Sequence, residues 1–234
     1  MPVSVEIRRG TDRFVEREPG RLTRHSLAFG AAYDADNLRF GPMVCHDDHL
    51  LGDGRGFGTH RHGDLVVVTY VVSGALTHTG PTGCHTVGAG SVAVLRTGAG
   101  VEHSEVAARP QTRFVQVWLA DPDPPAETSY DVVDGRTGTD GGTGPLEVEP
   151  LPGARLTVLR LADGETATVP AAPRVHLYVA RGALLRGARV ELAADARVPV
   201  PVGGDGEALG ALPGLAGDPA LVEVLPAALA VIAG

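Results

Sequence analysis

Two short clusters of histidine and glutamate, well separated along the chain, constrain its fold more than any other feature. They are Gly56-Phe57-Gly58-Thr59-His60-Arg61-His62 and Gly98-Ala99-Gly100-Val101-Glu102-His103-Ser104-Glu105. On a β-strand, residues i and i+2 point to the same face. His60 and His62 are therefore predicted to share one face of a strand. The same spacing predicts a shared face for His103 and Glu105. If the two strands lie opposite each other inside a barrel, the four side chains converge on one point.

The residue types in these clusters restrict what could bind there. Three neutral imidazoles and one carboxylate, with coordination positions left open, suit Fe(II), Mn(II), Ni(II), Co(II), Cu(II) and Zn(II). No thiolate belongs to the set, which disfavours a closed structural zinc site. The sequence therefore predicts one divalent metal ion, with open positions for O2 or a substrate. The alternative is a pair of surface histidines on one strand and an exposed polar pair on the other.

Strand patterns dominate the rest of the chain. Alternating or β-branched runs cover residues 65–72, 75–78, 92–95 and 112–119, and a turn is predicted around residues 80–83. The 32 glycines and 18 prolines fit short strands separated by turns, and 43% hydrophobic residues are enough for a buried core. We therefore expect an all-β fold of the sandwich or barrel class.

A polar, glycine-rich segment over residues 134–145 interrupts the strand pattern. It is predicted to mark a domain boundary, the alternative being a flexible surface loop inside one domain. The expected domains are a metal-binding barrel over residues 1–133, a linker over 134–147 and a second barrel over 148–234.

The second half of the chain echoes the first. The run Tyr70-Val71-Val72-Ser73-Gly74-Ala75-Leu76 is matched by Tyr178-Val179-Ala180-Arg181-Gly182-Ala183-Leu184. With this offset, His60 corresponds to Thr168 and His62 to Pro170. One short echo is modest evidence for a duplication. It predicts a second, degenerate barrel without metal ligands.

The net charge and the N-terminal sequence limit the partners and the location that we expect for this chain. The net charge of −8 gives no electrostatic reason to bind nucleic acid directly, while a protein partner stays possible. The N-terminus lacks a signal-peptide pattern, and no apolar run approaches the roughly 18 residues of a membrane span. We expect a cytoplasmic protein with no membrane contact. Cys45 and Cys84 are expected to be free thiols, with a disulfide as the alternative.

The remaining polar residues near the clusters are expected to be structural or solvated. His78 lies on a predicted strand and could point into or out of the barrel; a structural role is favoured. Glu102 has the opposite strand parity to His103 and is expected to face away from the metal. The histidines in polar, turn-rich contexts are expected to be solvated, namely His46, His49 and His85.

Together these motifs resemble the pirin family of the cupin superfamily, and in particular the bacterial pirin-like quercetin 2,3-dioxygenases. The resemblance is strong over roughly residues 20–130 and looser afterwards. The segments that carry it are Phe40-Gly41-Pro42, Gly56–His62, Thr69–His78, Gly98–Glu105, Gln116-Val117-Trp118-Leu119 and Pro125–Tyr130. It implies a bicupin of two tandem β-barrels (double-stranded β-helices) with Fe(II) in the first. The family's metal-ligand positions are occupied here by His60, His62, His103 and Glu105.

The resemblance also implies an activity. A flavonol such as quercetin would bind the metal through its deprotonated hydroxy-ketone, and Glu105 would serve as ligand and general base. Reaction with O2 would cleave the flavonol ring and release carbon monoxide. The alternatives are a non-enzymatic, redox-sensing iron module that binds a protein partner, and another cupin reaction on a small diketone or phenol. Arg61 stands where the family usually has proline, Gly63 where it usually has a basic residue, and Val66 where it usually has glutamate. These three departures bear on the substrate more than on the metal.

Overall fold

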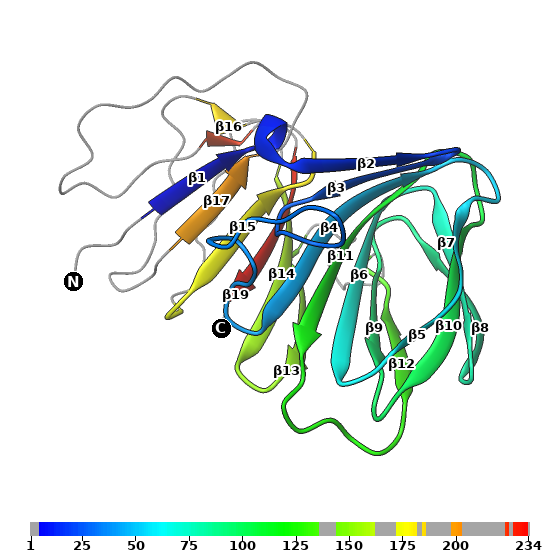
Figure 1. Cartoon of the computed structure of the whole chain (residues 1–234). Coiled ribbons are helices and arrows are strands. Elements are labelled where there is room, and N and C mark those ends of the chain that lie inside the picture. The colour runs from blue at the N-terminus through cyan, green and yellow to red at the C-terminus, as the bar shows by residue number, and fades with distance from the viewer. Residues whose placement is uncertain are drawn as a thin grey trace. The chain divides into compact units, whose positions relative to one another are not determined.

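The computed structural model describes residues 5–135, 144–161 and 172–181, together with the backbone of four short strands beyond residue 183. Within these residues the fold is almost purely β, with one 3₁₀ turn at Gly10–Asp12 and nineteen strands (Figure 1). The expected all-β class is therefore confirmed. No helix in the described part of the chain is long and apolar enough to cross a membrane.

The chain divides into two compact units. One comprises Arg13–Gly142, and the other combines Met1–Asp12 with Thr143–Gly234. The first twelve residues thus group with the second unit, because strand β1 (Val5–Arg9) pairs in parallel with β17 (Val198–Val202). The division differs there from the expected barrel over residues 1–133. Long-range strand pairing of this kind leaves no local pattern in the sequence.

The Arg13–Gly142 unit, hereafter the metal-site unit, consists of two sheets. Their strand orders are β12-β9-β6-β11-β4-β3-β2 and β5-β10-β7-β8. The strands are β2 (Phe14–Glu18), β3 (Arg21–His25), β4 (Met43–Leu51), β5 (Gly56–His62), β6 (Leu65–Ser73), β7 (Ala75–Gly80), β8 (Gly83–Gly88), β9 (Val92–Arg96), β10 (Val101–Ala107), β11 (Thr112–Ala120) and β12 (Ser129–Val133). The four strands expected from the sequence correspond to β6, β7, β9 and β11. Both ligand clusters lie on strands of the smaller sheet.

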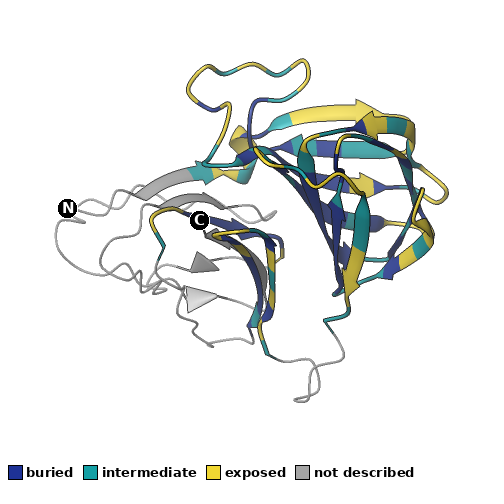
Figure 2. Ribbon diagram, turned by 90° about the horizontal axis from the view of Figure 1, so that it is seen from below, coloured by how far each residue is buried: buried dark blue, intermediate teal, exposed yellow. Residues whose placement is uncertain are grey.

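Burial along the strands follows the side-chain alternation of a sheet. In β10 every second residue is buried, so His103 and Glu105 face the interior with the apolar residues of the same strand. The central strand β6 is buried along nearly its whole length. Figure 2 shows buried and exposed positions alternating along the strands of this unit. One core cluster joins the two sheets and comprises Leu51, Val71, Leu76, Val87, Ala93, Ala107 and Phe114.

The second unit contains a four-stranded sheet of order β13-β14-β19-β15. Its strands are β13 (Leu146–Leu151), β14 (Ala154–Leu161), β15 (Val175–Val179) and β19 (Ala227–Ala233), and a short pair is formed by β16 (Leu184–Leu185) and β18 (Glu223–Val224). Tyr178, the echo of Tyr70, is buried on a strand as Tyr70 is. The counterparts of the metal ligands, Thr168 and Pro170, and most of the predicted linker lie outside the described residues.

Candidate metal centre

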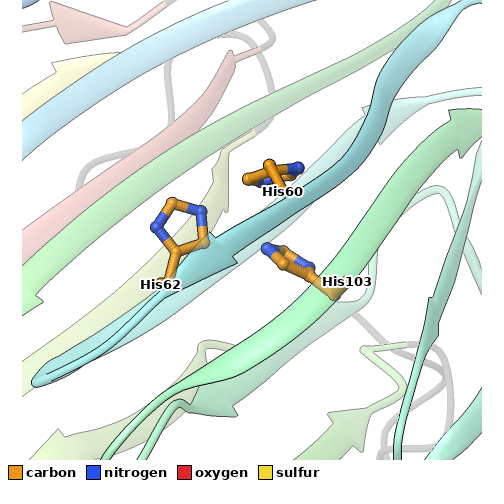
Figure 3. A group of neighbouring side chains, drawn as sticks. All are labelled: His60, His62 and His103. Atoms are coloured by element: carbon orange, nitrogen blue, oxygen red, sulfur yellow. The ribbon is translucent and has the colours of Figure 1, made fainter.

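Three imidazoles of the metal-site unit converge on one point. His60 and His62 come from β5 and His103 from β10, and one potential ligand atom from each lies within 4.8 Å of the other two. Figure 3 shows the three rings gathered in the space beside the two strands. Ring centroids are 4.7 Å apart for His60 and His62, and 4.4 Å apart for His60 and His103. No other group of three metal-ligating side chains within that distance occurs in the described part of the chain.

Strand register explains this convergence. β5 and β10 are antiparallel neighbours, and His103 pairs directly with His60, while Val101 pairs with His62. Directly opposed residues in an antiparallel pair place their side chains on the same face of the sheet. The i, i+2 spacing then adds His62 to that face, as the sequence predicts.

Burial favours the neutral, metal-binding form of two of the three histidines. Burial, assisted by the neighbouring imidazoles, lowers the pKa of His103 to about 3, and burial with the charge of His60 lowers the pKa of His62 to about 4. The Nδ1–H of His60 donates to the carbonyl oxygen of Gly58 at 2.7 Å, so the lone pair of this ring is on Nε2. Both ring nitrogens of His103 are buried without a hydrogen-bond partner among the described residues. Three convergent imidazoles, one of them buried with both ring nitrogens unpaired, fit a bound metal ion.

Glu105 lies near the three histidines but is not one of the converging group. The pairing of β10 with β5 shifts register after His103, so that Glu105 pairs with Phe57. Its carboxylate instead accepts hydrogen bonds from Gln116 Nε2, at 3.0 Å to Oε1 and 2.9 Å to Oε2. The side chain is 4% exposed, and burial raises the pKa of Glu105 to about 7 even though the bond from Gln116 opposes this shift. Glu105 thus shares a face of β10 with His103, but its carboxylate is held by Gln116 and is not part of the converging group.

A hydrogen-bonded chain through Gln116 fixes that carboxylate. Trp118 Nε1–H donates to Gln116 Oε1 at 2.9 Å, which turns the amide nitrogen toward Glu105 and Thr69. The indole of Trp118 in turn contacts the ring of His62, with centroids 4.5 Å apart. The sequence motifs alone assign no role to Gln116. Its signal in the sequence is a single polar residue in an apolar run of β11, two residues before Trp118.

Aromatic rings extend from the histidines in two directions. On one side, Phe29 packs edge-on against Trp118 with centroids 5.0 Å apart. On the other, His78 lies 5.0 Å from His103 and stacks on Tyr130 at 3.9 Å with an interplanar angle of 8°. His78 therefore points into the unit beside the converging histidines.

The expectation of solvated histidines is wrong for His46 and His49, which are 1% and 4% exposed. They lie on β4, which is buried on both faces despite its polar sequence. Buried partners compensate this polarity: His49 Nδ1 hydrogen-bonds Thr23 Oγ1 at 2.9 Å, and Asp47 Oδ1 accepts from His25 Nδ1 at 2.8 Å. The sequence alone predicts a solvated loop for such a polar run, because the hydrogen-bond partners on the neighbouring strand are distant in sequence.

Glu102 is exposed and faces away from the converging histidines, as expected. Arg61, which stands where the family usually has proline, is also exposed and donates to the carbonyl oxygen of Ala99 at 3.2 Å. Val66, which stands where the family usually has glutamate, is fully buried. Cys45 is buried, Cys84 is exposed, and both are free thiols as expected.

Buried histidines make the metal-free protein sensitive to acid. Burial is the largest cause of the lowered pKa of His46, His49, His62, His78 and His103, which fall from 6.5 to about 4, and for His103 to about 3. Such groups contribute stability that is fully present above pH 6.5 and is lost as the pH falls toward 4, because the unfolded chain then binds more protons. Glu105 and His25 have raised pKa values and so favour the folded state at lower pH, but they are two groups against the five histidines.

The urea midpoint of the metal-free chain is therefore expected to drop steeply between pH 6.5 and pH 4. Urea titrations at fixed pH values, with a chelator present, measure this. A midpoint that stays constant over that interval would contradict the neutral, buried state of these histidines.

Comparisons with known proteins agree with this geometry. A family model described as Pirin matches residues 8–119. A Mycobacterium tuberculosis protein named "Putative quercetin 2,3-dioxygenase" is 33% identical over 208 residues, which cover 82% of this chain and 85% of that protein. An Escherichia coli protein named "Quercetin 2,3-dioxygenase" is 31% identical over 98 residues, covering 41% of this chain and 42% of that protein.

A solved structure extends the likeness to both units. The crystal structure of the bacterial pirin YhhW in complex with nickel(II), from Escherichia coli, superposes with a TM-score of 0.69 at 17% identity. The match covers 97% of this chain and 96% of that one. The expected fold, an all-β tandem cupin, is therefore confirmed.

Proposed function

This chain belongs to the pirin family, and from that premise we propose that it is a metal-dependent dioxygenase that cleaves a flavonol such as quercetin with O2. The observation that carries the proposal is the convergence of His60, His62 and His103 next to the buried carboxylate of Glu105. Relatives named as quercetin dioxygenases support the choice of substrate class.

The proposed cofactor is a single divalent metal ion, with Fe(II) as the first candidate. His60, His62 and His103 would hold it through one neutral ring nitrogen each. Such an ion supplies Lewis acidity toward the substrate hydroxyl and access to O2 chemistry. Glu105 follows His103 by two residues on the same face of β10. We therefore retain it as a fourth ligand, reached by rotation of its side chain away from Gln116.

The proposed role of Glu105 in the reaction is that of general base. Gln116 presents its amide N–H groups to both carboxylate oxygens, which favours the ionised form and orients it. The carboxylate would take the proton of the flavonol hydroxyl group. Burial at 4% exposure keeps competing water away from it.

The proposed wall for the flat aromatic substrate is formed by Trp118 and Phe29. Both rings are partly exposed and meet edge-to-face next to His62. Aromatic faces of this kind bind planar ligands by stacking. Val66, at 0% exposure, is in the core and is not part of the proposed wall.

Metal analysis and oxygen uptake test the proposal together. Protein purified without oxygen is expected to carry about one metal ion per chain, and to consume O2 when quercetin is added. The matched control is the flavone that differs from quercetin only by lacking the 3-hydroxyl group, for which no uptake is expected. Metal binding without quercetin-dependent uptake would refute the flavonol activity and favour a non-enzymatic, redox-sensing role with a protein partner.

A further inference from the structure

The imidazole of His78 is buried in the metal-site unit with neither ring nitrogen hydrogen-bonded. The residue is 1% exposed, and both Nδ1 and Nε2 lack a partner among the described residues. Buried polar groups in native proteins are nearly always paired, because an unpaired one keeps the full cost of its desolvation. An unpaired buried imidazole at this place therefore needs an explanation that involves the neighbouring site.

The sheet places His78 on the far side of His103 from His60. Strand β10 lies between β5 and β7, and Glu105 pairs with His78 on β7. Gly80, two residues further along β7, lies beside His103: a Cβ atom added there would be 3.4 Å from His103 Cβ and 3.3 Å from His78 Cε1. The absence of a side chain at Gly80 thus leaves space in which the two imidazoles approach, with centroids 5.0 Å apart.

Tyr130 holds the ring of His78 in place. The two rings are stacked almost in parallel, with centroids 3.9 Å apart and an interplanar angle of 8°. Stacking restricts rotation of the imidazole plane, so the direction of its nitrogens toward the interior is set by packing.

When one ring nitrogen of His103 binds a metal, the other needs a hydrogen-bond acceptor. Figure 3 shows one nitrogen of His103 on the side of His60 and His62 and the other nearer its own strand. A neutral imidazole that binds a metal through one nitrogen carries its proton on the other. Histidine ligands almost always donate that N–H to an acceptor, which sets the tautomer and the ring orientation. In this structure the second nitrogen of His103 is buried and unpaired.

We propose that His78 is a positioning residue for the metal centre, which accepts a hydrogen bond from the non-ligating N–H of His103 when the metal is bound. The inference rests on the metal site proposed above. The ring of His78 is stacked on Tyr130 and lies outside the converging group, so we assign it a hydrogen bond to a ligand rather than a bond to the metal. The neighbouring ring with unpaired nitrogens is that of His103, whose centroid lies 5.0 Å from that of His78, and rotation of the His103 ring on binding the metal would bring the two nitrogens together.

The test compares substitutions that keep the ring with substitutions that keep an acceptor. His78→Phe preserves a flat ring against Tyr130 but has no nitrogen. His78→Asn and His78→Gln place an amide oxygen near the positions of Nδ1 and Nε2, respectively. Metal-free, full-length chains are titrated with Ni(II) in competition with a chelator, and the visible absorption of the Co(II)-loaded chains is recorded. Urea unfolding of the metal-free chains checks that each variant is folded.

We expect His78→Phe to raise the Ni(II) Kd by about 10- to 100-fold, the usual effect of losing an outer-shell partner, and to alter the Co(II) spectrum. Its metal-free stability is expected to match or exceed that of the wild type, because two unpaired nitrogens are removed. One of the two amide variants is expected to restore a Kd close to the wild-type value, which identifies the accepting nitrogen.

Other outcomes would overturn the inference. A wild-type Kd and Co(II) spectrum in His78→Phe would show that His78 only fills space, and so would an equal loss of affinity in all three variants. Failure of the wild-type chain to bind Ni(II) at all would refute the proposed metal site and, with it, the proposed role of His78. Loss of quercetin turnover is not a readout here. A wild-type protein that binds Ni(II) but ignores quercetin would therefore refute the proposed substrate and leave the role of His78 intact.

Discussion

Replacing His103 by alanine is expected to abolish stoichiometric metal binding and reduce turnover to background. His103 supplies the central imidazole of the group, opposite His60 across the β5–β10 pair. Without His103 the site keeps two imidazoles on one strand and a carboxylate that is hydrogen-bonded to Gln116 and would have to leave that partner to reach the metal. We expect the metal Kd to rise by more than about 100-fold. Losing a residue that hydrogen-bonds a ligand costs up to about 100-fold, and losing a ligand itself should cost more. Metal content after dialysis, and competition with a chelator, measure this.

His85→Ala is the matched control for that substitution. His85 is also a partly buried histidine of the smaller sheet, but its Nε2 is paired with the carbonyl oxygen of Thr82 at 3.1 Å, and it is outside the converging group. Its metal content is expected to equal that of the wild type. Because the ring of His103 makes no hydrogen bond in the described structure, His103→Ala loses packing only, and circular dichroism should confirm its fold. Normal metal content in a folded His103→Ala variant would refute the proposed metal centre.

Substituting Glu105 with glutamine is expected to lower turnover by about 10²- to 10⁴-fold, the usual contribution of a general base. The amide has nearly the same shape but cannot accept a proton at neutral pH. The three imidazoles remain, so most of the metal is expected to stay bound. Steady-state oxygen uptake with quercetin on metal-loaded protein provides the measurement. Turnover that survives in the loaded variant would exclude Glu105 as the base.

The pH profile adds an independent check on Glu105. Burial raises the pKa of Glu105 to about 7, so the carboxylate form, and with it turnover, is expected to increase as the pH rises toward 7. A bound cation would lower this pKa and move the rising limb to lower pH. Glu105→Gln should lose the rising limb, whereas Glu102→Gln should keep it. Glu102 is the matched control because it lies on the same strand but faces solvent.

The residue-level pattern predicted much of the site. The i, i+2 spacing of His60 and His62 is a property of one strand, and so is the inward direction of His103. Such local geometry is set by backbone pleating and needs no knowledge of distant segments. For the same reason the sequence predicted the all-β class and the strands that became β6, β7, β9 and β11. The family resemblance added the tandem fold, which the structural comparison confirms.

Other features depended on how strands pair. The irregular pairing of β5 with β10 places Phe57 opposite Glu105, and Gln116 on another strand binds the carboxylate of Glu105. The polar run of β4 becomes core because partners on β3 satisfy it.

The sequence by itself determined that this chain forms β-strands carrying three histidines on inward faces, because alternation along a strand is local. Only the tertiary structure decided which of the four predicted ligands meet, and which neighbours hold them. The space beside Gly80, the stacking of His78 on Tyr130 and the Trp118–Gln116–Glu105 chain join residues from different strands. The physical reason is that register and bulges arise from pairing between distant segments, whose energies no single segment contains.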